Sequence, residues 1–379
     1  MPILEKIVIQ DFRNIELQEL EFSPKINCIG GGNGEGKTNL LEAVWYLSMT
    51  KSALGRQDRY NFRKGTEAFS LLGSYLMPSG LRSRISISVS SNGEKKLKRD
   101  EKVCERVSDH IGLLPVVMVS PSDTSLVSES GEERRRFVNS VLSQLDREYL
   151  SSLQQYNKLL MQRNRLLKEG YMDEDYLDTL DRRLEDLATP VYMRREAFCR
   201  DLLPLAAECY GRISAGGESI GMEYRSDLSK GSLYDMLRAG RERDRMLKYT
   251  GAGIQRDDFV FTLDGMPLRR CGSQGQQKSF LVALKFSQYG IMKDSCGFAP
   301  TLLLDDLFDK LDPGRISRLL RMVSDDDFGQ IFITDSDKVR TANILDALGS
   351  DRACFEAKGG VFSRLCADSE GKRRSLCTS

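Results

Sequence analysis

The sequence is short of several residue types and patterns, and each shortage excludes a class of function. It has one histidine, His110, among 379 residues, which excludes multi-histidine metal sites and catalysis by a histidine pair. No run approaches the roughly 20 uninterrupted apolar residues of a membrane span. The first residues carry Glu5 and Asp11 inside an apolar run and lack the pattern of a secretory signal. We therefore expect no membrane segment and a cytoplasmic location.

Cysteines are present, but their pattern argues against disulfides and zinc. The nine cysteines are odd in number and widely scattered, and none forms a CxxC pair. Disulfide frameworks are typical of short secreted chains with an even number of cysteines, and zinc sites usually carry CxxC pairs. We therefore expect reduced thiols, as in a cytoplasmic protein.

An excess of charge of one sign is also lacking. The 56 Lys and Arg residues nearly balance the 55 Asp and Glu residues, so the formal net charge is +1. This balance excludes nucleic-acid binding through bulk positive charge, so DNA or RNA must bind a local basic patch. Hydrophobic residues make up 40% of the 379 residues. That content supports a sizeable core, and at about 150 residues per domain the length suggests two or three domains.

Hydrophobic patterning divides the chain into strand-rich and helix-rich parts. Alternating apolar and polar residues predict strands at 3–10 and 15–22. From Phe137 onward apolar residues recur every three or four positions, which predicts two long antiparallel helices that Pro190 and Pro204 should kink or divide. Further patterns predict helices at 39–49 and 276–292 and strands at 258–263, 301–304 and 330–334. This order predicts a mixed α/β unit split by a helical insert.

A glycine-rich segment between a predicted strand and a predicted helix matches the phosphate-loop pattern G-x-x-x-x-G-K-[ST]. Its eight residues are Gly31, Gly32, Asn33, Gly34, Glu35, Gly36, Lys37 and Thr38. The glycines let the backbone curl so that several N–H groups point at phosphate oxygens, and the positive helix end adds to the attraction. We expect Lys37 to reach the β- and γ-phosphates of ATP and Thr38 to bind Mg²⁺. The alternative, a glycine-rich turn without a nucleotide, is disfavoured because all the fixed positions of the pattern are present.

A second segment supplies the acids that such a site needs. The apolar strand predicted at 301–304 ends in Asp305 and Asp306, which is a Walker B arrangement. We expect Asp305 to hold Mg²⁺ through its water shell, and Asp306, a catalytic residue with Lys37, to orient or activate the attacking water. The alternative is a solvated pair of carboxylates at a strand end, which the presence of Lys37 and Thr38 disfavours.

A third segment stands at the start of the helix predicted at 276–292. Its residues are Ser273, Gln274, Gly275 and Gln276. Small and amide residues at a helix N-terminus offer an anion-binding surface. Together with the two segments above, they resemble the signature loop of the ABC-type ATPases.

That resemblance implies a homodimer that forms when ATP is bound. In this class the signature loop contacts the γ-phosphate of the ATP held by the partner subunit. Leu311–Pro313 would be the D-loop at the same interface. Thr334 and Asp335 stand where this class usually carries a switch histidine, which suggests slow hydrolysis.

Within the class, the chain resembles the RecF family of bacterial recombination mediators over its whole length. The segments that carry the resemblance are Phe12–Asn14, Pro121–Asn139, Gln162–Asn164, Arg256–Asp258 and Leu304–Asp312. Glu129, Gly131, Asn139 and Gln255 depart from the family's motifs. The helical insert is far too short for the long coiled coil of the chromosome-maintenance members of this branch.

The resemblance implies an α/β fold, an ABC-type P-loop ATPase head with a helical lobe inserted between its two halves. Residues 1–125 would form the N-terminal half of the head, with the phosphate loop. Residues 126–250 would form the helical insert, and residues 251–367 the C-terminal half, with the signature loop, Walker B and D-loop. Residues 368–379 would be a loose basic tail.

The resemblance also implies a function in DNA repair, DNA replication and the SOS response to DNA damage. RecF-like proteins bind double-stranded and gapped DNA when ATP is bound, and act with RecO and RecR to load RecA at single-stranded gaps. The implied enzyme is a slow, DNA-stimulated ATPase that uses ATP and Mg²⁺. The alternative is an ATP-driven switch that recruits proteins, with incidental DNA binding.

No base-reading motif is present, so DNA contacts are expected at phosphates, through basic clusters. The candidates are Lys51, Arg56, Arg59, Lys95, Lys96 and Arg99. For any one cluster, a solvated face is an equal alternative. A further cluster, Arg134–Arg136, is either a DNA contact or a structural part of the helical insert.

Overall fold

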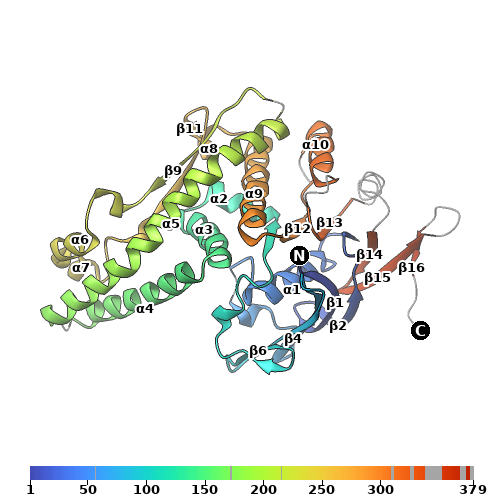
Figure 1. The fold of residues 1–379 in the computed structure, drawn as a ribbon, viewed down its shortest axis with the longest axis horizontal. Coiled ribbons are helices and arrows are strands. Elements are labelled where there is room, and N and C mark those ends of the chain that lie inside the picture. The colour runs from blue at the N-terminus through green and yellow to red at the C-terminus, as the bar shows by residue number, and fades with distance from the viewer. Residues whose placement is uncertain are drawn as a thin grey trace. The chain divides into compact units, whose positions relative to one another are not determined.

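The computed structural model describes residues 1–55, 57–170, 173–214, 216–308, 311–324, 328–337, 352–367 and 373–375. Its contacts divide the chain into two compact units. The first unit combines Met1–Asp123 with Gln288–Ser379, and the second unit is Thr124–Ser287. In Figure 1 the N-terminal part of the first unit is blue to cyan and its C-terminal part is orange and red. The second unit is mostly green and yellow.

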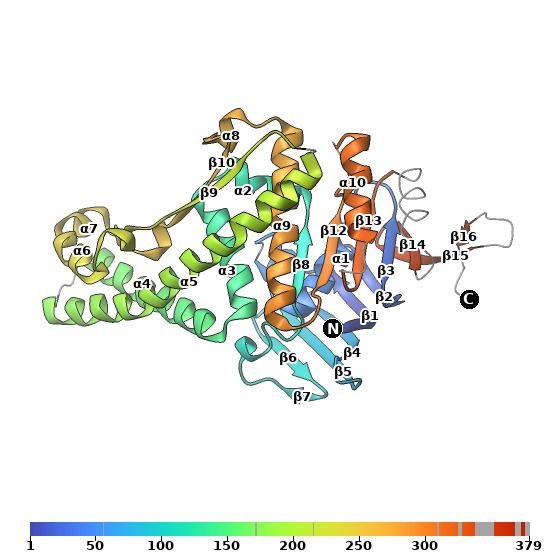
Figure 2. The same cartoon turned by 45° about the horizontal axis from the view of Figure 1, so that its top comes forward.

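A seven-stranded sheet forms the core of the first unit. Its order is β16–β15–β14–β3–β13–β12–β8, and β14, β3, β13, β12 and β8 run parallel. The strands are β3 (Ile26–Gly30), β8 (Val116–Val119), β12 (Thr301–Asp305), β13 (Ile331–Asp335), β14 (Arg352–Lys358), β15 (Val361–Ala367) and β16 (Arg373–Ser375). Figure 2 shows β8, β12 and β13 side by side. The central strands are nearly all buried, as strands covered on both faces of a parallel sheet are.

Two helices of the first unit follow strands of this sheet. Helix α1 (Lys37–Met49) begins directly after the glycine-rich loop that leaves β3. Helix α10 (Pro313–Ser324) lies in the chain between β12 and β13. The glycine-rich loop is therefore at the carboxyl end of a parallel strand, which is the edge where α/β sheets bind ligands.

The first unit also contains an antiparallel sheet, in the order β2–β1–β4–β5–β6–β7. Its strands are β1 (Ile3–Phe12), β2 (Ile15–Glu21), β4 (Ala68–Leu76), β5 (Arg82–Ser90), β6 (Lys95–Arg99) and β7 (Lys102–Val103). The strands predicted at 3–10 and 15–22 are confirmed. Burial alternates along β4 and β5, so that one face of this sheet packs and the other is solvated.

The second unit is mainly helical, with one small sheet in the order β11–β10–β9. Its helices are α2 (Ser125–Ser128), α3 (Gly131–Leu145), α4 (Arg147–Glu169), α5 (Glu174–Ser214), α6 (Leu233–Ala239), α7 (Arg241–Leu247) and α8 (Leu268–Cys271). Its strands are β9 (Ile220–Arg225), β10 (Asp258–Leu263) and β11 (Met266–Pro267). Helix α9 (Gln274–Cys296) begins in this unit and crosses the boundary at Ser287.

The two long predicted helices are present, with one further break that the pattern did not predict. The helical run from Phe137 is divided at Asp146, whose carboxylate accepts the N–H groups of Glu148 and Tyr149 and so begins α4. Pro190 and Pro204, which are expected to kink or divide the second run, do not divide it, because α5 is one helix of 41 residues that contains both. A proline removes one helical hydrogen bond, and the long buried apolar stripe of α5 outweighs that loss.

The second unit also extends further along the chain than the predicted insert of 126–250. It continues to Ser287 because β10 pairs with β9 and because arginines of the helices bind two acids at the start of β10. Arg134 binds Asp258, and Arg195 binds Asp257. The segment with the signature loop therefore packs with the helical lobe. Of the predicted tail 368–379, only Arg373–Ser375, as β16, is described.

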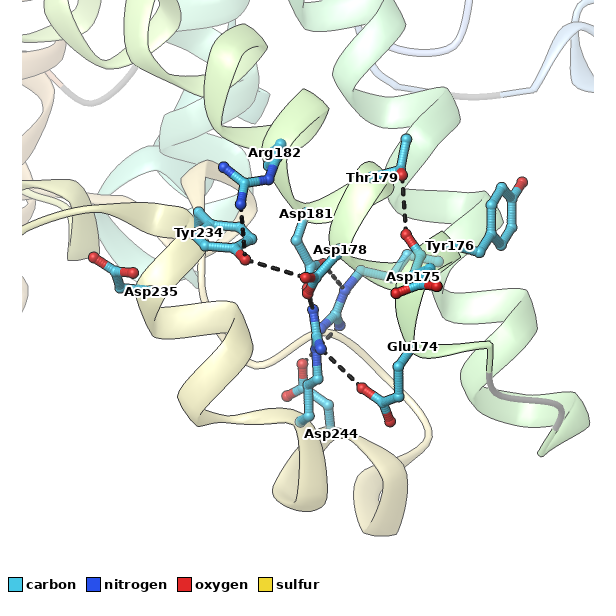
Figure 3. A network of polar contacts seen from close by, with 12 residues as sticks. Glu174, Asp175, Tyr176, Asp178, Thr179, Asp181, Arg182, Tyr234, Asp235 and Asp244 are labelled. Carbon is cyan, nitrogen blue, oxygen red and sulfur yellow. Dashed lines mark hydrogen bonds and ion pairs between the residues drawn. The ribbon is translucent and has the colours of Figure 1, made fainter.

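A buried charge network ties together the helices α4, α5 and α7. The Arg163 side chain is fully buried and donates to the carboxylates of Asp181 and Asp244, at 2.7 Å each. Arg241, which lies on α7, donates hydrogen bonds to Asp178 and Asp181 of α5. Figure 3 shows Asp178 and Asp181 on α5 and Asp244 on α7 turned toward one another. Buried charges are tolerated only when they are paired and hydrogen-bonded, so this network specifies how the helices meet.

We predict that Arg163→Ala lowers the free energy of unfolding by about 3–5 kcal/mol, because it leaves Asp181 and Asp244 buried without their cation. The measurement is urea unfolding followed by circular dichroism. The control is Arg165→Ala, which removes an exposed arginine paired with Glu169 one turn away and should change stability by less than about 0.5 kcal/mol. Equal effects of the two substitutions would contradict the role of the network.

Candidate nucleotide site

The glycine-rich loop is held closed by its own lysine. Lys37 is buried, and its ammonium donates hydrogen bonds to the carbonyl oxygens of Gly31 and Gly32, at 2.9 Å each. An ammonium has three donors, and within the described part of the chain the third has no recorded partner. The lysine therefore lies across the loop with one N–H group available to a ligand.

Two positions of the loop require glycine for steric reasons. A Cβ at Gly31 would lie 2.6 Å from the carbonyl oxygen of Ala357 on β14. Gly36 has a φ of 105°, and a Cβ there would lie 2.9 Å from the Asn14 side chain. The loop is thus packed between the turn after β1 and the end of β14, and its conformation depends on both.

The hairpin between β14 and β15 also holds the loop, a contact that the sequence motifs do not reveal. Gly360 donates its N–H to the carbonyl oxygen of Glu35 at 2.9 Å, and Gly359 donates to the Glu35 carboxylate. A Cβ at Gly360 would overlap with the carbonyl oxygen of Asn14. The Gly-Gly pair is a visible turn signal, but nothing in the sequence connects it with a loop more than 300 residues away.

A cluster of two acids and two threonines lies where α1, β12 and β13 meet. The Thr38 hydroxyl donates to both oxygens of the Asp305 carboxylate, at 3.0 and 2.8 Å. The Thr334 hydroxyl donates to the same carboxylate at 2.7 Å and accepts the N–H of Asp306 at 3.0 Å. The structure therefore brings together Lys37, Thr38, Asp305 and Asp306, the four residues that the motifs assign to one site.

The Asp305 carboxyl group is buried. Burial raises its pKa above the ordinary value, and the neighbouring Asp306 acts in the same direction, while hydrogen bonds from Thr334 and Thr38 oppose the shift. Such a carboxylate is stabilised by a bound cation, since a metal ion reverses the cost of burying a negative charge.

Asp306 is held in an unusual conformation. Its φ is 42°, which is rare for a residue other than glycine. Its Oδ1 atom is buried and has no hydrogen-bond partner among the residues that the structure describes. Strained backbone and unpaired buried acceptors are features of functional sites, where a ligand completes the hydrogen bonding.

The residues present fit a nucleoside triphosphate with Mg²⁺. Mg²⁺ prefers carboxylate, hydroxyl and water oxygens, and the Thr38 hydroxyl and Asp305 carboxylate are already in contact. The loop N–H groups and Lys37 suit phosphate oxygens. The unpaired Oδ1 of Asp306 suits a water molecule that donates a hydrogen bond.

The signature residues lie at the start of α9, in the second unit. The Ser273 hydroxyl accepts the N–H of Gln276 at 3.3 Å, and the Gln276 side chain accepts the N–H of Ser273 at 2.6 Å. These reciprocal bonds form a capping box, which satisfies two backbone donors at the helix start. The N–H groups of Gln274 and Gly275 have no recorded partner within the described residues.

The predicted DNA-contacting residues fall into two groups. Lys95 is engaged inside the protein: its ammonium donates to the Thr50 carbonyl oxygen and pairs with Asp58, both at 2.8 Å, over the Tyr46 ring. By contrast, Lys51, Lys96 and Arg99 are exposed. Arg59 is exposed too and stacks on the Tyr60 ring, and Arg56 lies outside the described residues.

The arginines at 134–136 are all engaged with partners inside the protein. Arg134 forms a two-pronged ion pair with Asp258, at 2.7 and 3.1 Å. Arg135 donates to the Asp257 carbonyl oxygen, and Arg136 pairs with glutamates of its own helix. The sequence leaves this cluster open between DNA contact and structure, and its partners favour structure.

These features define an ABC-type ATPase head with a helical lobe. The family model described as RecF/RecN/SMC N terminal domain matches residues 3–349. A solved Smc head domain from Pyrococcus furiosus has the same fold, with a TM-score of 0.55 and 15% identity over 99% of this chain and 96% of that one.

The chain belongs to the RecF family. It is 41% identical to the DNA replication and repair protein RecF of Bacteroides fragilis over 96% of this chain and 98% of that protein. It is 40% identical to the RecF protein of Bacteroides thetaiotaomicron over 97% of this chain and 100% of that protein. The resemblance stated from the sequence is thereby confirmed.

Solved structures of RecF are similar along nearly the whole chain. The structure described as the recombination mediator protein RecF-ATP in the RecFOR pathway has a TM-score of 0.86 and 29% identity, over 96% of this chain and 98% of that one. The structure described as RecF-ATPrS has a TM-score of 0.85 and 28% identity, with the same coverage. Among the described residues, no helix is both long and apolar enough to cross a membrane.

We predict that Thr334→Val lowers kcat for ATP hydrolysis by about tenfold, which corresponds to about 1.4 kcal/mol, because it removes the hydroxyl that joins Asp305 to the Asp306 N–H. ATP affinity should change by less than about threefold, since Lys37 and the loop are untouched. The measurements are steady-state phosphate release and nucleotide binding. Thr334→Ser keeps the hydroxyl and should retain wild-type kcat; a valine variant as fast as wild type would contradict the prediction.

Proposed function

We propose that the protein is an ATP-dependent DNA-binding protein of recombinational repair and replication, acting in the cytoplasm. It closes as an ATP-bound dimer on duplex or gapped DNA, and with RecO and RecR it helps to load RecA at single-stranded gaps. The observation that carries the proposal is the contact of Thr38 with Asp305 beside the strained Asp306. Membership of the RecF family and the similarity to a RecF–ATP structure from the RecFOR pathway support the rest.

Hydrolysis follows from the roles of a few side chains. Lys37 and the loop N–H groups bind the β- and γ-phosphates and neutralise their charge. Thr38 and Asp305 hold Mg²⁺, which, when bound, supplies Lewis-acid stabilisation of the phosphoryl oxygens. Asp306 orients the attacking water through its unpaired Oδ1, and Thr334 keeps both acids in place.

A second copy of the chain completes the site. Ser273, Gln274, Gly275 and Gln276 of one protomer meet the γ-phosphate bound by its partner, so that ATP joins the two copies. Hydrolysis is slow, because the switch position carries Thr334 and Asp335 in place of a histidine, and DNA stimulates it. A threonine hydroxyl can orient groups by hydrogen bonds but has no pKa near 7 for proton transfer.

DNA binds through phosphate contacts on the basic side chains of the first unit. We assign this contact to Lys51, Arg56, Arg59, Lys96 and Arg99. We assign Lys95 a supporting role, since its ion pair with Asp58 and its bond to Thr50 hold the start of β6.

A second candidate function is an ATP-driven switch that recruits proteins, with incidental DNA binding. Exposed apolar side chains near the charge network of the second unit favour it. Met246 is 78% exposed and Met161 66% exposed. Tyr249 and Tyr176 are exposed as well, and Tyr176 accepts a hydrogen bond from Gln162 of α4. Met161, Tyr176 and Met246 lie on α4, α5 and α7, the three helices that the charge network joins, and contiguous exposed apolar side chains mark surfaces for protein partners.

We predict that Asp306→Asn traps an ATP-bound dimer, because water is no longer activated while the ligands of ATP and Mg²⁺ remain. Sedimentation velocity with saturating Mg²⁺-ATP should give the dimer mass. Ser273→Arg should bind ATP as a monomer and fail to dimerise, because a long side chain blocks the exposed signature loop. An Asp306→Asn protein that stays monomeric at saturating ATP would contradict the composite site.

We predict that Lys96→Ala with Arg99→Ala weakens DNA binding in the presence of ATP. The slope of affinity against salt concentration should fall by about one for each phosphate that is no longer bound. Fluorescence anisotropy over a range of salt concentrations measures both. The control is Lys6→Ala, which removes a cation that is paired with Glu19 and lies on β1, three strands away from β6 in the same sheet. DNA binding that is unaffected by the pair, with partner binding abolished in Met246→Ser and Tyr249→Ser, would favour the recruitment switch.

A further inference from the structure

The signature loop is tied to the helical lobe by one carboxylate. The Gln276 side-chain amide donates to Glu218 Oε1 at 2.6 Å, across 58 residues of sequence. The other carboxylate oxygen of Glu218 accepts the hydroxyl of Tyr210, which is buried in the last turns of α5. Neither Glu218 nor Tyr210 belongs to a nucleotide-binding motif, and all three residues lie within the second unit.

The carboxylate decides which way the Gln276 amide faces. An ionised carboxylate only accepts hydrogen bonds, so the NH₂ group of Gln276 must point at Glu218. The amide oxygen then faces the N–H of Ser273, which it accepts at 2.6 Å. A reversed amide would place oxygen against carboxylate and NH₂ against N–H, and both contacts would be repulsive. Glu218 therefore sets the capping box of α9.

Glu218 is itself held on both sides. The next residue, Ser219, donates its N–H to the Asp264 carboxylate at 2.7 Å and accepts the Asp264 N–H at 2.8 Å. A Cβ at Gly221 would overlap with the Thr262 hydroxyl oxygen, so β9 and β10 approach closely there. With Tyr210 on its other side, the Glu218 carboxylate has little freedom to follow a displaced Gln276.

We propose that Glu218 is a positioning residue for the signature loop, acting through Gln276. The capping box occupies the N–H groups of Ser273 and Gln276, so that the N–H groups of Gln274 and Gly275 remain for a phosphate oxygen of the nucleotide on a second copy. This proposal rests on the proposed composite site. It adds that the geometry of the loop is maintained by the lobe, through Tyr210 and Glu218, before any nucleotide arrives.

The first experiment compares Glu218→Ala with Glu218→Gln in the full-length protein. Glu218→Ala should weaken Mg²⁺-ATP-dependent dimerisation about tenfold in sedimentation velocity and lower kcat, with ATP affinity of the monomer unchanged. Glu218→Gln should stay within about threefold of wild type, because its amide oxygen accepts from Gln276 and its NH₂ group can donate to the Tyr210 oxygen. Glu208→Ala, which removes an exposed carboxylate of the same helix as Tyr210, is the matched control and should behave as wild type.

A second measurement does not depend on dimerisation. Hydrogen exchange of the amides of Ser273 and Gln276 should be faster in Glu218→Ala than in Glu218→Gln, since the capping box no longer has a fixed orientation. Gln276→Glu should weaken dimerisation by setting two carboxylates against each other. Adding Glu218→Gln should restore it, because the amide introduced at position 218 then donates to the carboxylate introduced at position 276, which still caps Ser273.

The outcomes separate this inference from the function on which it rests. If the wild-type chain stays monomeric with saturating Mg²⁺-ATP, the composite site fails, and the hydrogen exchange still decides whether Glu218 sets the loop. If the wild-type chain dimerises and Glu218→Ala dimerises equally well, with unchanged exchange at Ser273 and Gln276, the positioning role of Glu218 is overturned while the composite site stands.

Discussion

The candidate site depends on one buried carboxylate, that of Asp305, and on the two hydroxyl groups that bind it. Thr38 stands at the start of α1, and Thr334 lies on β13, next to Asp305 on β12. These three side chains meet only if β3, β13 and β12 are neighbours in this order in a parallel sheet. Burial of a negative charge is costly unless it is bonded or neutralised, so the same arrangement that makes the sheet also creates a place for a cation.

Sequence motifs predicted that the phosphate loop and the acids after β12 share one site, but not the further contacts that hold the site in place. The phosphate loop and the acids after β12 are contiguous motifs, and each is recognisable because its spacing carries its chemistry. Thr334 reaches the site because β13 lies next to β12, and Gly360 reaches it because the β14–β15 hairpin lies against the phosphate loop. Neither contact can be read from the neighbouring residues in the sequence. The sequence marks Thr334 only as the residue standing where a histidine is usual.

The sequence also does not reveal the partners of charged side chains. Lys95 and Arg134 are candidates for DNA contact in the sequence, yet each has an acid partner far along the chain, Asp58 and Asp258. A charge pattern along the chain does not reveal whether a side chain meets water, an acid or a phosphate. Pro190 and Pro204 are a similar case, because the packing of α5 outweighs a strong local rule. Many of the balanced charges are therefore paired with one another inside the protein, and the net charge does not show how many basic side chains remain on the surface to contact DNA.

In the proposed composite site, the phosphate loop and the signature loop are each held in place by contacts within their own unit. The contacts that shape the phosphate loop come from Asn14, Gly360 and β14 in the first unit, and those that shape the signature loop come from Glu218 and Tyr210 in the second. When both halves are ordered in advance, binding ATP costs little ordering within either. In the proposed dimer, the free energy of nucleotide binding would then be available for bringing two copies together, and its loss on hydrolysis would release them. A shift between open and closed populations needs a ligand that distinguishes the two states, and a γ-phosphate recognised from both sides meets that requirement.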